Sequence, residues 1–286
     1  MSANTEKFKQ KHRDFKVITV LSRKGGTGKS STVVNLAQAF RICVKNVLIV
    51  DADDQRSVMD WEELAEANNR MEKYGDFFPE VVAADNPTAI NQLFDTLDND
   101  IAYKDSCEYV FIDMAGHMNQ IREGGLTSEL FDAIIKQSDA LIMVNTPDMF
   151  SVRANKEGCA LINERMEVLG EKLIVRSLMN NVPTRMDSGT RKSMQEYRDL
   201  VEAGLFWPFF ETEIGYSRRV AASLSEGSTA FIPVKEKCAE WYDSLMREMM
   251  DLMVENIKTI KSLKNLKKDI NAIVSSENLI SAKPKQ

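Results

Sequence analysis

A glycine-rich stretch near the start of the chain carries residue types suited to binding a polyphosphate. Residues 17–21 are apolar with several β-branched side chains, which favours a buried strand, and K-G-G-T-G-K-S follows at residues 24–30. Apolar residues then recur over residues 31–40 at the spacing of a helix face. Between a strand and a helix, the backbone N–H groups of such a loop form a concave anion site. We therefore expect Lys29 to reach the terminal phosphates and the Ser30 hydroxyl to ligate Mg²⁺.

Three aspartates follow two later apolar runs. Asp51 and Asp53 end VLIVDAD, and Asp113 ends YVFID. The carboxyl ends of parallel strands meet at one edge of a sheet, and side-chain alternation makes Asp51 and Asp53 point the same way. Phosphoryl transfer needs a carboxylate for the metal and a group that orients the attacking water. We expect Asp113 to hold Mg²⁺ through water and Gly116 to meet the γ-phosphate. The alternative is that these aspartates are turn formers or helix caps.

The glycine loop departs from the strict template G-x-x-x-x-G-K-[ST], because Arg23 stands where the first glycine should be. The extra lysine, Lys24, makes the loop resemble the deviant Walker A motif of the ParA/MinD family of dimerising ATPases. This resemblance implies that Lys24 crosses a dimer interface and touches the nucleotide of the other subunit. The alternative is a glycine-rich turn with unrelated lysines, which the downstream aspartates disfavour.

The resemblance also implies a role for each residue of the site. In the family the first aspartate of a D-x-D-P-Q pattern supports the metal shell and the second positions the hydrolytic water; here Asp54 replaces the proline. The strand expected to end in SLMNN places Asn180 or Asn181 where the family has an asparagine against adenine, although asparagine also ends strands as a turn residue. The catalytic residues implied are Lys24, Lys29 and Asp53, and the metal ligands are Ser30, Asp51 and Asp113. The ATP-binding residues implied are Lys24, Gly25, Gly26, Thr27, Gly28, Lys29, Ser30, Ser31 and Asn180.

Other segments extend the resemblance over roughly residues 16–255. DADDQRSVMDW, with Trp61, resembles the switch region of ParF-type plasmid partition ATPases, and VNTPDMFSVRANKEG resembles the segment that lines the dimer interface. ETEIGYSRRVAASLSEGSTAF resembles a late segment with an arginine-bearing turn, which makes Arg218 and Arg219 the implied DNA contacts. Such ATPases form ATP-dependent homodimers that bind DNA without sequence preference. A ParB-like or ParG-like centromere-binding partner then stimulates hydrolysis.

The rest of the sequence supplies the elements that must position these residues. A second strand is expected within NVLIVDADDQRS (46–57), where it ends in the carboxylate cluster. Further strands are expected at 80–84, 108–116, 139–147, 171–181 and 205–214, and Pro208 favours an edge position for the last. Helices are expected at 58–75, 87–97, 128–137, 151–170, 189–204 and 217–227, with a long one from 234 to about 273. Strands alternating with helices predict an α/β, doubly wound, mostly parallel sheet flanked by helices, and the resemblance implies a P-loop NTPase of the SIMIBI type.

The two ends of the chain differ from its middle. Residues 1–16 are expected to form a disordered basic arm, residues 17–256 an ATPase domain, and residues 257–286 an amphipathic basic helix with a polar tail. In this last segment apolar residues such as Ile257 and Ile260 alternate with a lysine-rich face. Docking on a partner or another copy is favoured over DNA contact, and DNA contact over membrane anchoring, because SSENLISAKPKQ follows and no aromatic residue lies on the apolar face.

Composition limits the remaining function classes. The chain has 286 residues and a net charge of −6, so any DNA contact needs a local basic patch. The cysteines and histidines offer no metal-ligand spacing, and His117 is expected to be an exposed loop residue. No apolar run reaches membrane-spanning length and the cysteines form no CxxC pair, so we expect a cytoplasmic protein. The resemblance to DNA-binding partition ATPases implies that it is nucleoid-associated.

Two alternative functions stay open. One is a MinD/MipZ-like cell-division or cargo-positioning ATPase that acts on a membrane or protein surface. The other is a biotin- or cobalamin-pathway synthetase of the same P-loop branch, which would need a substrate pocket for which the sequence has no motif. A nitrogenase-type iron–sulfur reductase is excluded, because no cysteine follows Asp113 before Cys159.

Overall fold

A single parallel sheet positions the predicted site. The computed structural model describes residues 13–43, 46–99, 107–114, 116, 125–232 and 236–253. Its strands are β1 (Lys16–Leu21), β2 (Val47–Ala52), β3 (Glu80–Ala83), β4 (Tyr109–Met114), β5 (Ala140–Asn145), β6 (Ile174–Val182) and β7 (Phe209–Gly215). They form a seven-stranded sheet in the order β3-β2-β4-β1-β5-β6-β7, and each neighbouring pair is parallel. The doubly wound α/β fold is confirmed, and β7, which begins directly after Pro208, lies at an edge as predicted.

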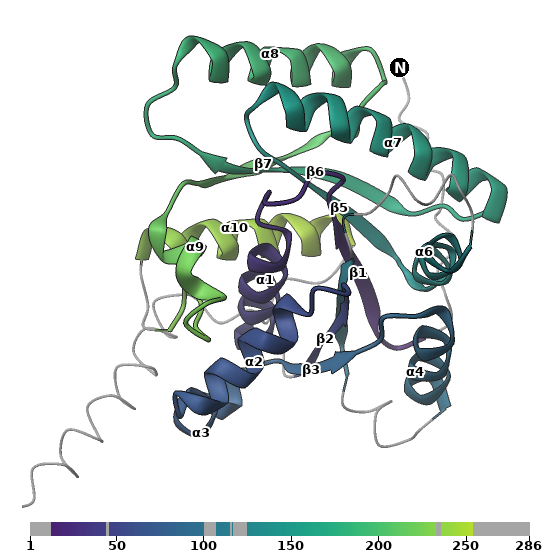
Figure 1. Cartoon of the computed structure of the whole chain (residues 1–286), viewed down its shortest axis with the longest axis vertical. Helices are drawn as coiled ribbons and strands as arrows, with labels where there is room; N and C mark the ends of the chain where they lie inside the picture. The colour runs from purple at the N-terminus through teal and green to yellow at the C-terminus, as the bar shows by residue number, and fades with distance from the viewer. Residues whose placement is uncertain are drawn as a thin grey trace, which may run out of the picture.

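Helices cover both faces of the sheet (Figure 1). They are α1 (Lys29–Cys43), α2 (Ser57–Ala67), α3 (Arg70–Tyr74), α4 (Pro87–Asn99), α6 (Leu126–Gln137), α7 (Met149–Leu169), α8 (Ser188–Glu202), α9 (Arg218–Ser223) and α10 (Glu236–Leu252). Helices α1, α2, α3, α9 and α10 pack into one hydrophobic cluster, and α4, α6, α7 and α8 pack into another on the opposite face. Alternate residues of β1 enter the two clusters: Ile18 and Val20 the first, Val17 and Leu21 the second.

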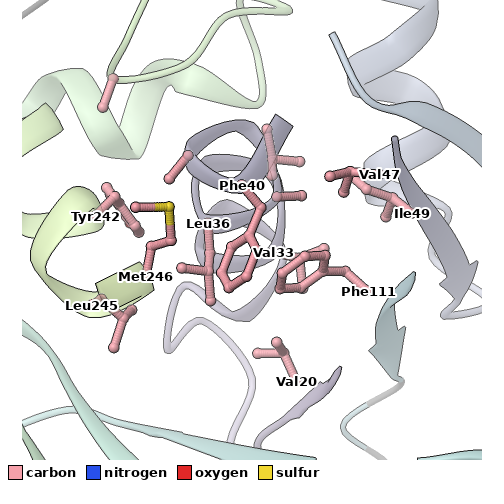
Figure 2. Close-up of a cluster of buried hydrophobic side chains, with 14 of the residues drawn as sticks. Val20, Val33, Leu36, Phe40, Val47, Ile49, Phe111, Tyr242, Leu245 and Met246 are labelled. Atoms are coloured by element: carbon pink, nitrogen blue, oxygen red, sulfur yellow. The ribbon is translucent and has the colours of Figure 1, made fainter. Parts of the chain in front are cut away.

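The helix that follows the glycine loop is almost fully enclosed. Residues 31–40 of α1 are all buried, so this helix touches the sheet on one side and other helices on the rest. Figure 2 shows Phe40 beside Phe111 of β4, with Tyr242 and Met246 of α10 on the other flank. The Phe40 and Phe111 rings meet edge to face, with centroids 5.1 Å apart. This packing fixes the N-terminus of α1, and therefore the loop, against the centre of the sheet.

One predicted helix is two helices. The pattern over residues 58–75 predicted a continuous helix, but α2 ends at Ala67 and α3 begins at Arg70. Asn69 between them has a φ of 55°, in the left-handed region that asparagine tolerates better than most residues. A local break of this kind leaves the apolar spacing on both sides intact, so the periodicity did not reveal it.

The predicted end of the N-terminal arm at residue 16 is too late. Phe15 is 2% exposed and packs near Phe94, with ring centroids 6.2 Å apart. Arg13 donates a hydrogen bond from Nη2 to Asp139 Oδ2 at 3.1 Å. Residues 13–16 therefore belong to the folded domain. The predictions for residues 1–12, for His117 and for the chain after Met253 lie outside the described residues, and the boundary at 256/257 stays a prediction.

The loop after α9 touches the backbone of α2. Gly227 has a φ of 58°, and a Cβ built there would lie 2.3 Å from Ala65 N. Trp61 of α2 donates from Nε1 to Ser228 O at 2.9 Å. Helix α2 is therefore held directly against the loop that follows α9. Among the residues that the structure describes, no helix is both long enough and apolar enough to cross a membrane.

Gly227→Ala should lower the free energy of unfolding more than Gly204→Ala does. Both glycines have positive φ, so an alanine costs about 1 kcal/mol at either position. A Cβ at Gly204 meets nothing within 4 Å, whereas at Gly227 it meets the α2 backbone. Urea unfolding of the two variants measures the difference, and equal losses would contradict the close packing of α2.

Candidate functional site

The loop between β1 and α1 is held from the end of β6. Asn180 donates from Nδ2 to Thr27 O at 2.7 Å. Gly28 has a φ of 84°, and a Cβ there would lie 2.4 Å from Asn180 Nδ2. Only glycine fits this contact, because any side chain would push the loop away from β6.

Lys29 lies at the meeting point of three strand ends. Its Nζ donates to Asp53 Oδ2 at 2.9 Å and to Asp113 Oδ1 at 2.7 Å. Burial lowers the pKa of Lys29, but the charges of Asp113 and Asp53 outweigh burial and raise that pKa above its ordinary value. Burial raises the pKa of Asp113, which is fully enclosed, while the Lys29 ammonium opposes that rise. The structure thus brings together the loop lysine and the two aspartates predicted to serve the metal and the water.

Asp51 makes a different set of contacts. It lies directly beside Asp113 in the register of β2 and β4. Its Oδ2 accepts from the N–H groups of Val58 and Met59 at 2.9 and 3.0 Å, and its Oδ1 accepts from Asp53 N at 3.1 Å. Burial raises the pKa of Asp51 above its ordinary value, although these three hydrogen bonds act to lower it. Asp51 therefore caps the first turn of α2, as the alternative interpretation allowed, and it also fixes the backbone of Asp53.

Lys24 is held within its own chain. Its Nζ contacts both carboxylate oxygens of Asp148, at 2.9 and 2.8 Å. Asp148 also caps α7, accepting from Phe150 N and Ser151 N at 3.0 Å, and it accepts from Thr146 Oγ1 at 2.6 Å. Burial alone would raise the pKa of Asp148. The hydrogen bonds from Lys24, Thr146 and Ser151 outweigh burial and lower that pKa below its ordinary value. In the single chain, the lysine predicted to cross the interface is neutralised by the first turn of α7.

Helix α7 also fixes the start of the loop. Arg23 donates its backbone N–H to Asn155 Oδ1 at 3.0 Å, and its guanidinium pairs with Glu157. Asn155 is fully buried and donates from Nδ2 to Asn145 Oδ1 at 2.8 Å. The arginine that replaces the template glycine is therefore a contact between the loop and α7.

The predicted loop residues surround one cavity of about 650 Å³ at the carboxyl edge of the sheet. Asp53, Gln55, Gly116 and Asn181 also line it, as does one side of α9. The predicted residues that line it are Lys24, Gly25, Gly26, Thr27, Gly28, Lys29, Ser30, Ser31, Asp53 and Asn180. The cavity is large enough for a nucleotide. Whether Asn180 or Asn181 contacts a base stays a prediction.

Unpartnered buried atoms around the cavity fit a polyphosphate with a metal ion. Thr27 Oγ1, Asp113 Oδ2 and Asn180 Oδ1 are buried without a hydrogen-bond partner in the described structure. Buried polar groups are normally paired, so each marks a place where a ligand or water completes the site. No group of three or more His, Cys, Asp or Glu side chains that could hold a metal is found within the described ranges. Mg²⁺ is bound in proteins by one or two carboxylates together with phosphate oxygens and water, and Asp113 offers one such carboxylate.

The two predicted DNA contacts have different environments. Arg218 is exposed at the first residue of α9. Arg219 donates from Nη2 to Ile232 O at 2.6 Å and lies 3.4 Å from Glu226 Oε2. Arg219 therefore holds the loop after α9, which leaves Arg218 as the accessible member of the pair.

Asp148 and Asn155 are the functional residues that sequence reasoning missed. Asp148 precedes an apolar helix pattern, which is an N-cap signal, but nothing local links it to Lys24 at a separation of 124 residues. Asn155 lies in VNTPDMFSVRANKEG, whose resemblance implied a dimer interface, but nothing in that segment singles out this residue as a contact of the loop. Only the packing of α7 against the loop revealed either contact.

A phosphate loop at the centre of a parallel sheet, with a lysine bound to two aspartates from neighbouring strands, defines a P-loop nucleotide-binding protein. The chain belongs to the family described as the CobQ/CobB/MinD/ParA nucleotide binding domain, whose model matches residues 18–230. This confirms the family predicted from the sequence, whose members are P-loop ATPases.

Short stretches of the chain match curated proteins. One stretch is 50% identical over 48 residues to "Maintenance of carboxysome distribution protein A" of Gloeobacter kilaueensis, and covers 17% of this chain and 22% of the relative. Another is 42% identical over 41 residues to "Chromosome partitioning protein ParA" of Caulobacter vibrioides, and covers 14% of this chain and 15% of that relative. The chain thus spans about a fifth or less of these relatives.

Three solved structures share most of the fold. Apo McdA from Cyanothece gives a TM-score of 0.60 at 14% identity, covering 82% of this chain and 99% of that one. The MinD cell division protein of Aquifex aeolicus gives 0.55 at 18% identity, covering 82% and 97%. Cobyrinic acid a,c-diamide synthase of Mycobacterium smegmatis, with bound ATP analog and magnesium, gives 0.61 at 15% identity, covering 87% and 99%. At these identities the likeness shows the fold alone.

Lys29→Ala should abolish tight nucleotide binding, because the loop loses its buried ammonium. Lys24→Ala is the matched control and should bind nucleotide nearly as well as the parent, since Lys24 lies at the rim with Asp148. Titration with a fluorescent ATP analogue measures both, and unchanged affinity in Lys29→Ala would reject the site. Removing Lys29 leaves Asp113 buried and unpaired, at a cost of about 3–5 kcal/mol. The double variant Lys29→Ala/Asp113→Asn removes that charge and keeps the test valid if the single variant unfolds.

Proposed function

We propose that this protein is a Mg²⁺-dependent ATPase that acts as a molecular switch, forming a homodimer with ATP, binding DNA non-specifically and segregating plasmid or chromosomal DNA. The carrying observation is the buried Lys29 held by Asp53 and Asp113 at a nucleotide-sized cavity whose rim carries Lys24. The family assignment supports the ATPase chemistry, and the solved relative with an ATP analog and magnesium supports the choice of cofactors.

Each residue has a defined task in this proposal. With nucleotide bound, Lys29 leaves the two carboxylates for the terminal phosphates, and Asp53 is freed to orient the attacking water. Ser30 and Asp113 would hold Mg²⁺, which would supply positive charge to neutralise the phosphate oxygens. Asp51 acts on the metal shell indirectly, because it fixes the Asp53 backbone and caps α2. The backbone N–H groups of residues 25–31 bind the phosphates.

The rim of the cavity supports dimerisation. Phe150, in the first turn of α7, is 76% exposed, and Leu126, the first residue of α6, is 64% exposed. Asp148, which holds Lys24, lies two residues before Phe150. An exposed aromatic side chain beside an ion pair is the composition of an interface centre. We propose that Lys24 exchanges Asp148 for the partner's nucleotide when two copies meet.

DNA binding is assigned to the carboxyl edge of β6 and β7. Val182 and Gly215 are paired there, so the segments that follow both strands leave from the same edge. Arg185 and Arg218 are both exposed, each three residues beyond its strand end, and Arg191 in the first turn of α8 is also exposed. Clustered exposed arginines form the local patch that an acidic protein needs to meet DNA phosphates. A ParB-like or ParG-like centromere-binding protein is the proposed activator.

A second candidate is a MinD/MipZ-like positioning ATPase, with the same nucleotide cycle on a membrane or protein surface. The basic amphipathic sequence of residues 257–273 is the observation that favours it. A cobalamin-type synthetase shares the fold, but the rim lysine Lys24 beside an exposed Phe150 favours a dimerising switch.

Asp148→Ser should make ATP-dependent dimers form at a lower protein concentration. Serine keeps the cap of α7, but it cannot neutralise Lys24, so the lysine is free to cross. Lys24→Ala should dimerise less than the parent. Sedimentation velocity with ATP measures both. A loss of dimer in Asp148→Ser, with nucleotide affinity unchanged, would show that the Lys24–Asp148 contact does not compete with assembly.

Retention on non-specific duplex DNA, with ATP, ADP or no nucleotide at two salt concentrations, tests the function itself. We expect retention only with ATP and a steep loss at higher salt. Arg218→Ala should weaken retention several-fold and reduce the slope of log affinity against log salt concentration by about 1. The control Arg198→Ala removes an exposed arginine of α8 and should change neither quantity. Retention on anionic vesicles in place of DNA would favour the second candidate, and retention that ignores the nucleotide would reject the switch.

A further inference from the structure

A second cavity lies at the end of the sheet opposite the nucleotide site. It has a volume of about 310 Å³ and is lined by residues that include Val47 and Leu48 at the start of β2, Phe78, and Met71 of α3. Glu62 of α2 and Glu80 at the start of β3 also line it. The cavity therefore offers apolar surface together with two carboxylates, and the proposed nucleotide chemistry does not use it.

The carboxylates of this cavity have excess negative charge around them. Burial and the charges of Glu66 and Glu80 raise the pKa of Glu62. Within the described part of the chain, no ion pair joins Glu62 or Glu80 to a basic side chain. The rim carries two further exposed acids on α2, Glu63 and Glu66, whose charges also act on Glu62. Arg41 is the basic side chain among the lining residues, so the acids outnumber the cation, and a ligand with apolar side chains and positive charge suits this surface.

Helix α10, the last described helix, lies on the same face of the sheet as α2 and α3. Leu252 and Met253 at the end of α10 pack against the hydrophobic cluster that also takes Met71 and Phe77. Arg247 of α10 is close enough to Cys43, at the end of α1, for their charges to interact. Arg41, one half-turn earlier in α1, lines the cavity. Helix α10 therefore runs beside the end of α1, the helix that borders the cavity, and the described chain ends six residues after Arg247.

We propose that residues 257–273 of the same chain dock on this second cavity and its acidic rim. In the sequence of that segment, apolar residues recur every three or four positions from Ile257, and lysines occupy the positions between them. Isoleucine and leucine side chains fit the apolar walls, and the lysines pair with Glu62, Glu80 and the rim carboxylates. The lysines are Lys258, Lys261, Lys264, Lys267 and Lys268.

This docking does not depend on the proposed function. The second cavity contains no residue of the nucleotide site, and the test needs neither ATP nor DNA. The proposal can therefore fail while the ATPase assignment stands, and the reverse also holds.

Carbodiimide coupling of the full-length protein, followed by mass spectrometry, tests the contact directly. The reagent joins a lysine amine to a carboxylate only where the two touch. We expect cross-links from Lys258, Lys261 or Lys264 to Glu62 or Glu80 in protein of monomer mass. Their absence, or the same links only in protein of dimer mass, would overturn docking within one chain; the second result would assign the segment to another copy.

The accessibility of Cys107 supplies an independent readout. This thiol lines the cavity, and burial raises its pKa to about 12. Reversing three charges of residues 257–273 (K258E/K261E/K264E) should release this segment from the cavity and speed alkylation of Cys107 several-fold. Reversing two lysines of the terminal tail (K283E/K285E) is the matched control and should leave the rate unchanged. Equal rates of Cys107 alkylation in the two variants would overturn the proposal. Protection of the lysines of residues 257–273 from acetylation only when DNA is added would also overturn it.

Discussion

The contact of Lys29 with Asp53 and Asp113 is the interaction on which the rest of the site depends. It joins the segments that follow β1 and β2 to the end of β4 through one ammonium, with N–O distances of 2.9 and 2.7 Å. In a buried site neither the lysine nor Asp113 could stay charged without the other, because an unpaired buried charge is strongly destabilising. The same arrangement holds the ammonium at the cavity in the described structure, where an entering anion would compete with the two carboxylates for it.

Helix α2 carries the geometry of this site to the rest of the molecule. Its first turn is capped by Asp51, and its Trp61 bonds to Ser228 in the loop after α9. Asn35 of α1 accepts from Ala230 N at 2.6 Å and ties the same loop to the helix that follows the phosphate loop. Helices α1 and α2 therefore hold the loop after α9 from two sides, and Asp51 connects this contact network to the end of β2.

The two ends of the sheet present opposite chemistry. The carboxyl edge combines Lys24, Phe150 and the exposed arginines beyond β6 and β7, whereas the other end carries the acidic cavity between α2 and β3. Relatives of this fold with different cellular roles share its core, so the core does not separate partition from positioning. The surfaces at the two ends decide which partners can bind, because affinity for DNA, membranes or protein depends on exposed charge and apolar area.

The sequence by itself determined the fold class, the phosphate loop, the family and the approximate bounds of most elements. These follow from local patterns, since strand and helix periodicity and the K-G-G-T-G-K-S spacing each lie within one short segment. Only the tertiary structure decided that Asp51 caps α2, that Asp148 holds Lys24, and that Arg219 binds Ile232 and leaves Arg218 exposed. The packing of Phe15 and the break at Asn69 also required it. The physical reason is that a side chain's partner is set by which elements meet in space, and Lys24 and Asp148 are 124 residues apart in the chain.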